Sequence, residues 1–374
     1  MAGIYIHIPF CKQACHYCDF HFSTSLKNRE DLLASIKMEL YLQKEYLKGQ
    51  SLETVYFGGG TPSLLTVAEL NSIMDIIHKH HSLQGDAEIT LEANPDDLDL
   101  KKITELKGSP INRLSIGIQS FYDEDLNWMN RAHRAEEAQS ALMNALHHGF
   151  ENLTVDLIYG YPLLSHEKWN KNLQKVIDLG IPHISAYSMT VEARTALNHQ
   201  ITKGQSAPMD EEQSERQFIF LMETLSANGY EHYEISNFAK DKRYARHNSN
   251  YWKGIPYLGI GPSAHSYNGT HRSWNIANNS KYIASIKEKK LPQEQETLTS
   301  TNRLNEYIMT SLRTIWGIDF TYILGTFGAE HLHQLQSNAQ QHLKSGHLYL
   351  HEDKLFLSQK GKLLADRIAA DLFF

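Results

Sequence analysis

The three cysteines of this chain, which are its only cysteines, lie within eight residues of one another. Cys11, Cys15 and Cys18 follow the spacing C-x3-C-x2-C in the segment HIPFCKQACHYCDF. An odd number of thiols in so short a loop does not form a disulfide framework, so the spacing predicts a metal site. Three thiolates on a cubane iron–sulfur cluster would leave one iron without a protein ligand and open to a small molecule.

A zinc site is the alternative interpretation of the same loop. Zinc accepts mixed cysteine and histidine ligands, and His7, His16 or His21 would be the fourth ligand. A structural zinc site would be closed by that ligand, whereas a catalytic one would keep an open position. The cysteine spacing alone fits both metals, because short spacings of this kind serve zinc and iron–sulfur clusters alike.

Over residues 1–190, two kinds of segment alternate, and they must position the cysteine loop. Short runs rich in β-branched residues alternate with stretches of helical periodicity, which is typical of a parallel sheet covered by helices. The predicted strands are Ile4–Ile8, Thr54–Phe57, Glu88–Leu91, Arg113–Ile118, Leu153–Ile158 and His183–Tyr187. The predicted helices are Asn28–Leu47, Val67–His80, Asp99–Leu106, Glu136–His148 and His166–Leu179. Six repeats predict an α/β fold, and we expect an incomplete (β/α)6 barrel of the TIM type.

Groups suited to ligand binding follow these predicted strands. A glycine run, Gly58–Gly60, follows the second strand, Glu92 and Gln119 follow the third and fourth, and Asp156 lies in the fifth. In a β/α barrel, ligand-binding groups gather at the carboxyl ends of the strands. We therefore expect these groups to share one small-molecule site with the cysteine loop. The glycine run is not a phosphate loop, because no Gly-Lys-Ser/Thr follows it.

The composition narrows the class of protein. The chain has 374 residues, of which 41% are hydrophobic and 21% charged, with a formal net charge of −7. No basic stripe is present, which argues against nucleic acid as the main ligand. No apolar run approaches the roughly 20 residues of a membrane span, and the first residues do not resemble a signal peptide. Reduced cysteines then fit a cytoplasmic protein.

The cysteine loop, with Tyr17 before its last cysteine, resembles the signature loop of radical S-adenosylmethionine enzymes. In that family three cysteines hold a 4Fe-4S cluster, and the amino and carboxylate groups of S-adenosylmethionine bind the fourth iron. Further segments resemble, in order, the oxygen-independent coproporphyrinogen oxidase group: YIHIPFC, YFGGGTPSLL, LEANP, LSIGIQSF, RAHR and VDLIYGYP. They span residues 5–162, so this resemblance is more specific than the cysteine motif alone.

The resemblance implies a role for each residue that matches a motif. Cys11, Cys15 and Cys18 would bind the cluster. Tyr5 would contact the carboxylate region of S-adenosylmethionine. The methionine part of that ligand would be lined by Gly59, Gly60 and Thr61, and its remaining polar groups would meet Glu92, Gln119, Arg131 and Asp156.

Two functional classes within this group differ in sequence. The oxidases carry a longer N-terminal extension and an extra cysteine just after the cluster loop, whereas Asp19-Phe20-His21-Phe22 supplies no cysteine here. The segment SAYSMTVE also departs from the oxidase pattern that accompanies a second S-adenosylmethionine. These departures count against an enzyme that decarboxylates the propionates of coproporphyrinogen, which is the alternative function.

Residues 247–252, HNSNYW, resemble the HNxxYW motif of HemW-like heme chaperones, and YLGIGPSAHSY after them fits that family too. The resemblance implies that heme is bound and delivered to respiratory haemoproteins. Imidazole is a common heme ligand, so His247 would be the axial ligand, beside the flat faces of Tyr251 and Trp252. Arg243 or Arg246 would pair with the heme propionates. An ordinary packed aromatic loop, with His247 bonded to backbone, is the alternative.

We expect three parts in the chain: a core barrel over residues 1–230, an extension with the HNxxYW motif over 231–292, and a C-terminal unit over 293–374. In the last part, helices at Arg303–Trp316 and His331–Ser345, strands at His347–His351 and Lys354–Ser358, and a helix at Gly361–Phe373 resemble a small winged-helix-like unit. Its charges are mixed, so we expect it to cover the barrel mouth or contact a partner protein. The expected partners are recipient haemoproteins, with membrane contact only through them, and a second copy in a dimer.

Overall fold

The computed structural model describes all 374 residues and contains fifteen strands and fifteen α-helices. The strands are β1 (Ala2–Ile8), β2 (Leu52–Gly59), β3 (Leu83–Ala93), β4 (Arg113–Gln119), β5 (Leu153–Tyr159), β6 (His183–Ser188), β7 (Glu231–Glu234), β8 (Asn237–Ala239), β9 (Tyr257–Ile260), β10 (His265–Tyr267), β11 (His271–Asn275), β12 (Gln293–Thr297), β13 (Ile318–Asp319), β14 (Leu348–His351) and β15 (Lys354–Leu357). The helices are α1 (Arg29–Leu42), α2 (Val67–His80), α3 (Leu100–Lys107), α4 (Asp123–Trp128), α5 (Ala135–His147), α6 (His166–Asp178), α7 (Ala196–Thr202), α8 (Glu211–Ala227), α9 (Arg246–Trp252), α10 (Asn279–Lys287), α11 (Ser300–Leu312), α12 (Phe320–Phe327), α13 (Ala329–Lys344), α14 (Gln359–Lys362) and α15 (Ala365–Asp371).

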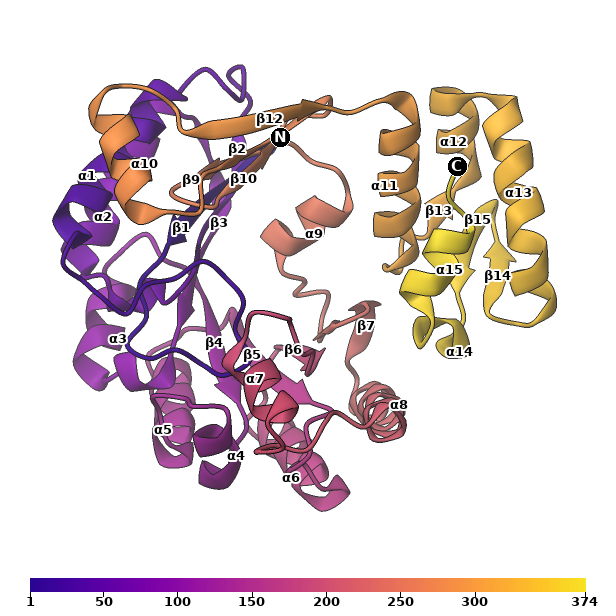
Figure 1. Cartoon of the computed structure of the whole chain (residues 1–374), viewed down its shortest axis with the longest axis horizontal. Helices are drawn as coiled ribbons and strands as arrows, with labels where there is room; N and C mark the ends of the chain where they lie inside the picture. The colour runs from indigo at the N-terminus through magenta and orange to yellow at the C-terminus, as the bar shows by residue number, and fades with distance from the viewer.

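Six parallel strands, β1 to β6, form the centre of a twelve-stranded sheet (Figure 1). The order across the sheet is β12-β11-β10-β9-β1-β2-β3-β4-β5-β6-β8-β7. The strand β9 is parallel to β1, while β8 is antiparallel to β6. The two edges of the sheet are different strands that do not pair, so the sheet stays open. The predicted α/β class is confirmed, and the open sheet around β1 to β6 is consistent with the incomplete barrel expected from sequence.

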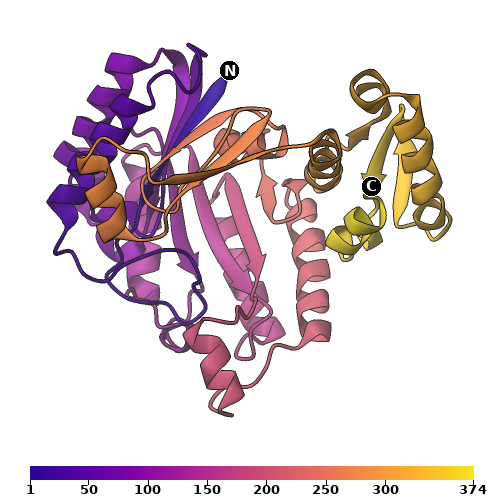
Figure 2. The ribbon, with the colours of Figure 1, turned by 45° about the horizontal axis from the view of Figure 1, so that its top comes forward.

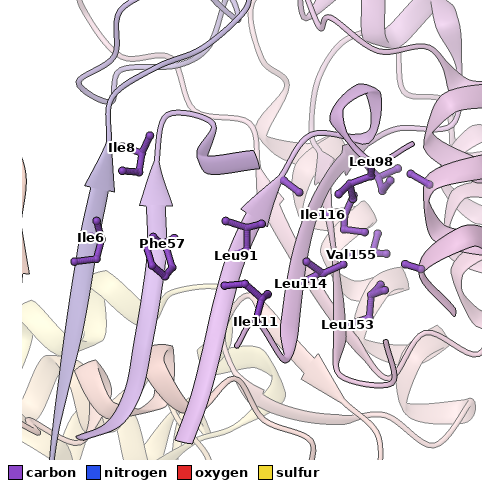
Figure 3. Close-up of a cluster of buried hydrophobic side chains, with 14 of the residues drawn as sticks. Ile6, Ile8, Phe57, Leu91, Leu98, Ile111, Leu114, Ile116, Leu153 and Val155 are labelled. Carbon is purple, nitrogen blue, oxygen red and sulfur yellow. The ribbon is translucent and has the colours of Figure 1, made fainter. Parts of the chain in front are cut away.

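The two faces of this sheet carry different side chains, because successive residues of a strand point to opposite faces. Apolar residues of β1 to β5, among them Ile6, Phe57, Leu91 and Leu114, belong to one buried cluster under the helices (Figure 3). The residues that alternate with them along each strand point to the opposite face of the sheet. We call it the interior face, and it is largely polar. Parallel sheets are usually apolar on both faces, so a polar interior face marks a site rather than a core.

The C-terminal elements form a second group that β12 and α11 connect to the sheet (Figures 1 and 2). Fifteen buried residues between Leu304 and Leu372 make up its own hydrophobic cluster. The chain order α11-β13-α12-α13-β14-β15 and the sheet order β13-β15-β14 are those of a winged helix. The wing turns at Glu352 and Asp353, whose φ angles of 46° and 58° suit a tight two-residue hairpin.

The element predictions failed mainly at helix ends and in short polar strands. Helix α1 ends at Leu42 rather than Leu47, because turns replace the helix before Lys48 and Gly49, which have positive φ. Helix α11 begins at Ser300, where the Thr299 side chain caps it, and ends before Trp316. The predicted last helix is two short ones, α14 and α15, with a break between them at Leu363 and Leu364. Strands β7 to β12 have little apolar periodicity and were not predicted.

Two local predictions are confirmed. Helix α2 begins at Val67 as predicted, after a capping box in which the Thr66 hydroxyl accepts from the Glu69 amide and the Glu69 carboxylate accepts from the Thr66 amide. The hairpin around Glu352 and Asp353 lies within one residue of its predicted bounds. None of the helices has the length and apolar character that crossing a bilayer requires.

Candidate functional site

A single cavity of about 1600 Å³ opens on the interior face of the sheet. It extends from the cysteine loop, across the carboxyl ends of the strands, to α8 and the C-terminal helices α14 and α15. Ten of the twelve residues predicted for the site line it: Cys11, Cys15, Cys18, Gly59, Gly60, Thr61, Glu92, Gln119, Arg131 and Asp156. The other two, Tyr5 and His247, do not line it.

The cysteine loop leaves β1 at the carboxyl end of the strand and presents three free thiols. The Thr61 hydroxyl lies 3.4 Å from Cys11 Sγ, and Arg131 Nη1 lies 3.5 Å from Cys15 Sγ, so both can donate to sulfur. Burial raises the pKa of the Cys11 thiol, and it raises that of Cys18 to about 11. Donors that face two of the three sulfurs would stabilise thiolates once a metal displaces the protons.

The loop fits an iron–sulfur cluster better than a single zinc ion. A zinc ion holds its ligands at about 2.0–2.3 Å, so they must converge on one point. No group of three or more His, Cys, Asp or Glu side chains converges in this way. A cluster meets its thiolates at separate irons, so three thiols around one loop suffice.

The histidines considered for zinc are engaged elsewhere. His7 Nε2 lies 2.9 Å from the backbone oxygen of His21, and His16 Nδ1 lies 2.8 Å from that of Trp128. His21 Nε2 lies 2.8 Å from Asn279 Oδ1. None of the three histidines lines the cavity, so the closed zinc site considered from sequence has no fourth ligand here.

The glycine run packs against the start of the cysteine loop. The Gly60 amide donates to Ile8 O at 2.9 Å and the Thr61 amide to Phe10 O at 2.6 Å. A Cβ on Gly60 would lie 2.7 Å from Phe10 O. Gly59 has a φ of +107°, and a Cβ there would lie 2.6 Å from the His7 ring. These glycines are required by the close approach of two backbone segments, which holds the cysteine loop to the strand ends.

Two buried carboxylates form part of the interior face. Tyr56 donates its hydroxyl to Glu92 Oε1 at 2.7 Å, and the Gly59 amide donates to Glu92 Oε2 at 3.2 Å. Burial raises the pKa of Glu92 to about 7 and that of Asp156 to about 6. Buried carboxylates without a cation regain stability when a ligand brings donors or positive charge, so these two are suited to bind hydroxyl, amino or sulfonium groups.

Arg131 and Gln119 lie beside the cysteine loop. Arg131 Nη2 donates to Asn94 Oδ1 at 2.7 Å and to Gly117 O at 2.9 Å, which fixes its guanidinium under Cys15. Arg131 Nε is buried without a partner. Gln119 has a φ of 65° next to an irregularity in the pairing of β4 with β5. A strained non-glycine residue and an unpartnered guanidinium nitrogen at one cavity wall are typical of a ligand site.

His247, predicted as the axial heme ligand, lies outside the cavity, at the opposite end of the interior face from the cysteine loop. Its side chain is buried, with 2% of the residue exposed, and burial lowers its pKa to about 3. Nδ1 lies 2.7 Å from Thr54 Oγ1 and Nε2 lies 2.8 Å from the Tyr251 hydroxyl. Both ring nitrogens are therefore occupied, and His247 is not placed as an open heme ligand. The hydrogen-bond partners of His247 are side chains, whereas the alternative interpretation, an ordinary packed aromatic loop, expected a bond to the backbone.

The other predicted heme contacts are also displaced from the cavity. Arg246 pairs with Asp86 at 3.1 Å, and Arg243 donates to Glu151 O at 3.0 Å. Neither arginine lines the cavity, and neither do Tyr251 and Trp252. Tyr5 has its hydroxyl 3.3 Å from His7 Nδ1 and stacks on Tyr56, beneath the cavity floor. These residues lie beneath the cavity. Helix α9, which carries the HNxxYW motif, fills the end of the sheet interior that is farther from the cysteine loop.

A chain of buried polar groups holds α9 in this place. Glu88 accepts hydrogen bonds from the backbone amides of Arg246 and His247, both at 3.1 Å. Arg113 lies 3.8 Å from Glu88, and Tyr233 bonds the amide of Ala245 at 3.2 Å. Buried polar groups that satisfy one another in this way fix a single arrangement of the segments that carry them.

Sequence reasoning missed several residues of the cavity. Tyr56, Asn94, Arg113 and Asn248 line it. Period-two alternation from Gln119 would have placed Arg113 on the interior face, and Tyr56 lies two residues before Gly58. Asn248 belongs to the HNxxYW motif, but no sequence signal distinguishes its side-chain direction from that of His247.

Comparison with known proteins identifies the family to which the chain is similar. The family model "Radical SAM superfamily" matches residues 5–186. The chain is 31% identical over 371 residues to "Heme chaperone HemW" of Bacillus subtilis, covering 98% of each chain. It is 32% identical over 375 residues to the Mycobacterium tuberculosis protein of the same name, covering 99% of this chain and 94% of that one. The solved structure titled "Coproporphyrinogen III oxidase (HemN) from Escherichia coli is a Radical SAM enzyme" superimposes with a TM-score of 0.86 at 22% identity, covering 100% of this chain and 90% of that one.

The structural likeness to the oxidase establishes a shared fold. The sequence relatives also establish the family, because their identity to this chain exceeds 30% along nearly the whole of both chains. Membership of this group implies the 4Fe-4S cluster and S-adenosylmethionine for which the thiols and the cavity are suited. The chain belongs to the HemW family of the radical SAM superfamily.

Proposed function

We propose that this protein is a cytoplasmic heme chaperone that binds heme together with a 4Fe-4S cluster and S-adenosylmethionine and delivers heme to respiratory haemoproteins. The observation that carries the proposal is that ten predicted cofactor residues line one cavity, in a chain whose relatives are named heme chaperones. The cavity exceeds the volume of about 300–1,000 Å³ that is usual for one ligand, so it has room for heme beside the nucleoside.

Each part of the chain has a distinct task in this proposal. Residues 1–230 would carry the cluster and S-adenosylmethionine, with Cys11, Cys15 and Cys18 as cluster ligands. Residues 231–292 would close the lower end of the interior face through α9. Residues 293–374 would cover the cavity mouth and contact the recipient haemoprotein, with a second copy of the chain as a further partner. Bound S-adenosylmethionine would supply radical chemistry, whereas heme transfer needs only binding and release.

The second candidate is an enzyme that decarboxylates coproporphyrinogen. It is favoured by one observation, the superposition of the whole chain on the oxidase HemN. The residues after the cluster loop, Asp19 to Phe22, lack the extra cysteine that the resemblance associates with oxidases. We therefore place this enzyme second.

Heme titration of the anaerobically reconstituted protein separates the two candidates. Saturable binding seen in the Soret band, followed by transfer of heme to an apo-haemoprotein, is the result expected for a chaperone. A decarboxylation assay with coproporphyrinogen, S-adenosylmethionine and a reductant runs in parallel. Robust turnover without stable heme binding would replace the chaperone by the enzyme.

A further inference from the structure

The far end of the cavity, away from the cysteine loop, combines cations with apolar side chains. Lys360 and Lys362 of α14 line it together with Leu363 and Leu364. Across the cavity, Phe218 and Ile219 of α8 add apolar surface. Leu364 keeps 44% of its surface exposed, so it offers apolar surface at the cavity mouth. We call these residues the mouth cluster.

Lys362 is the unusual member of the mouth cluster, because its side chain is partly buried and forms no ion pair. Nζ lies 2.9 Å from His232 Nδ1, and no carboxylate lies within ion-pair distance of it. Burial lowers the pKa of Lys362 to about 8 and that of His232 to about 3, so its one polar partner is a neutral imidazole. A buried cation held by a neutral group is stabilised when a ligand brings an anion.

A second cation, Arg313, borders the same end of the cavity. Its Nη2 lies 3.7 Å from Glu234 and its Nη1 lies 2.5 Å from Asp366, and the Trp252 ring lies 5.5 Å from the guanidinium carbon. Glu234 is near enough for its charge to act on Lys362, but its ion pair is with Arg313, and Glu211 and Glu215 of α8 also border the cavity. The free positive charge of this region is thus on α14.

We infer that the mouth cluster binds the carboxylate edge of a tetrapyrrole, with Lys362 as the anchor of a propionate and the leucines and α8 against the macrocycle. The inference rests on the proposed function, which supplies heme as the ligand. A porphyrin has a flat apolar body with two carboxylates on one edge, and the mouth cluster offers apolar surface beside two lysines on one short helix. The predicted propionate partners, Arg243 and Arg246, lie outside the cavity, so this assignment moves the carboxylates to the C-terminal helices.

The experiment compares two ligands with the same macrocycle, of which only one has ionised propionates. Hemin and hemin dimethyl ester are titrated, with Soret detection, into the full-length wild type, Lys362→Met, Lys362→Arg and the control Lys344→Met. Lys344 is exposed, lies on α13 and forms no ion pair. We expect Lys362→Met to weaken hemin binding by about tenfold, the loss that accompanies one partly buried charged contact, and to leave the ester unchanged. Lys362→Arg should recover most of the hemin affinity.

Three other outcomes would overturn the inference in distinguishable ways. Equal hemin affinity in wild type and Lys362→Met would exclude Lys362 as an anchor while the proposed function stands. An equal loss for hemin and for the ester would show that Lys362 only supports the fold at the mouth. Absence of saturable hemin binding to the wild type would reject the proposed function, and this inference with it.

Discussion

His247 Nδ1 lies 2.7 Å from Thr54 Oγ1, although 193 residues separate them in sequence. The bond joins α9 to the second parallel strand beneath the cavity floor, and the His247 ring stacks on Tyr56 at 5.0 Å between ring centroids. Tyr56 in turn donates to Glu92, which lines the cavity. The HNxxYW segment is therefore linked, through Tyr56, to a residue that lines the cavity.

Replacing His247 by Ala should weaken the fold while leaving the iron coordination of bound heme unchanged. The substitution empties a packed space and leaves Thr54 and Tyr251 without partners, which costs about 2–4 kcal/mol of unfolding free energy. Urea denaturation measures that loss, and Soret spectra of wild type and variant report the coordination. His351→Ala is the control, because that side chain is exposed. A changed Soret maximum with unchanged stability would restore His247 as a ligand.

The depressed pKa of His247 predicts a specific pH dependence of stability. The folded pKa of about 3 lies below the ordinary value of 6.5, so the unfolded chain binds a proton that the folded protein excludes. The stabilising contribution is complete above pH 6.5 and falls as the pH drops toward 3. At pH 5 this single group costs about 2 kcal/mol relative to pH 7.

Urea denaturation at pH 5 and pH 7 of wild type and His247→Gln tests this dependence. The variant should lose about 2 kcal/mol less than wild type between the two pH values, whatever its stability at pH 7. Parallel pH profiles would show that the histidine is protonated inside the folded protein.

Each cysteine of the loop should be necessary for the cluster. Cys15→Ser replaces the thiol that faces Arg131, and Ser is a poor ligand for iron. Reconstituted wild type should contain about four irons per chain, and the variant should lose the broad visible absorbance of the cluster and most of that iron. Thr24→Val is the control, since it removes an exposed hydroxyl just beyond the loop and no thiol. Retention of one tightly bound zinc by wild type in place of iron would contradict the cluster.

The sequence was sufficient to predict which residues at the strand ends border the site. It was insufficient to predict the side chains that are buried beneath the site. Cys11, Gly59 and Asp156 could be placed together because the strand ends of a parallel sheet share one edge. The direction of His247 could not be predicted, because it depends on how α9 enters the sheet interior and on Glu88, which is 159 residues away. The same holds for Lys362, whose contact with His232 spans 130 residues and forms only when the C-terminal elements pack beside β7.

Glu39 should be among the most important side chains for stability, although it lies far from the cavity. It is fully buried on α1 and accepts hydrogen bonds from Gly261 N at 2.8 Å, Asn275 Nδ2 at 2.7 Å and the Tyr282 hydroxyl at 2.5 Å. It thus ties α1 to the strands and the helix that follow β9. Glu39→Ala leaves several buried donors unsatisfied and should cost about 3–5 kcal/mol.

Chemical denaturation measures this cost, with Glu30→Ala as the control on the same helix. Glu30 is exposed and forms no ion pair, so its replacement should change the unfolding free energy by less than about 0.5 kcal/mol. Equal stability of both variants would mean that the buried hydrogen bonds accepted by Glu39 contribute nothing to the unfolding free energy.

The raised pKa of Glu92 predicts that S-adenosylmethionine binds more tightly as the pH rises. With a pKa of about 7, Glu92 is about one-tenth ionised at pH 6 and about nine-tenths ionised at pH 8. Ligand hydroxyl and ammonium groups donate to the ionised form, so the affinity of the reconstituted protein should rise by about tenfold over this range. Isothermal titration at both pH values measures the change. Glu92→Gln should bind weakly and with a flatter pH profile, whereas Glu211→Gln, an exposed carboxylate at the same cavity, should behave as wild type. An unchanged pH profile in Glu92→Gln would assign the dependence to Asp156, whose pKa is also raised.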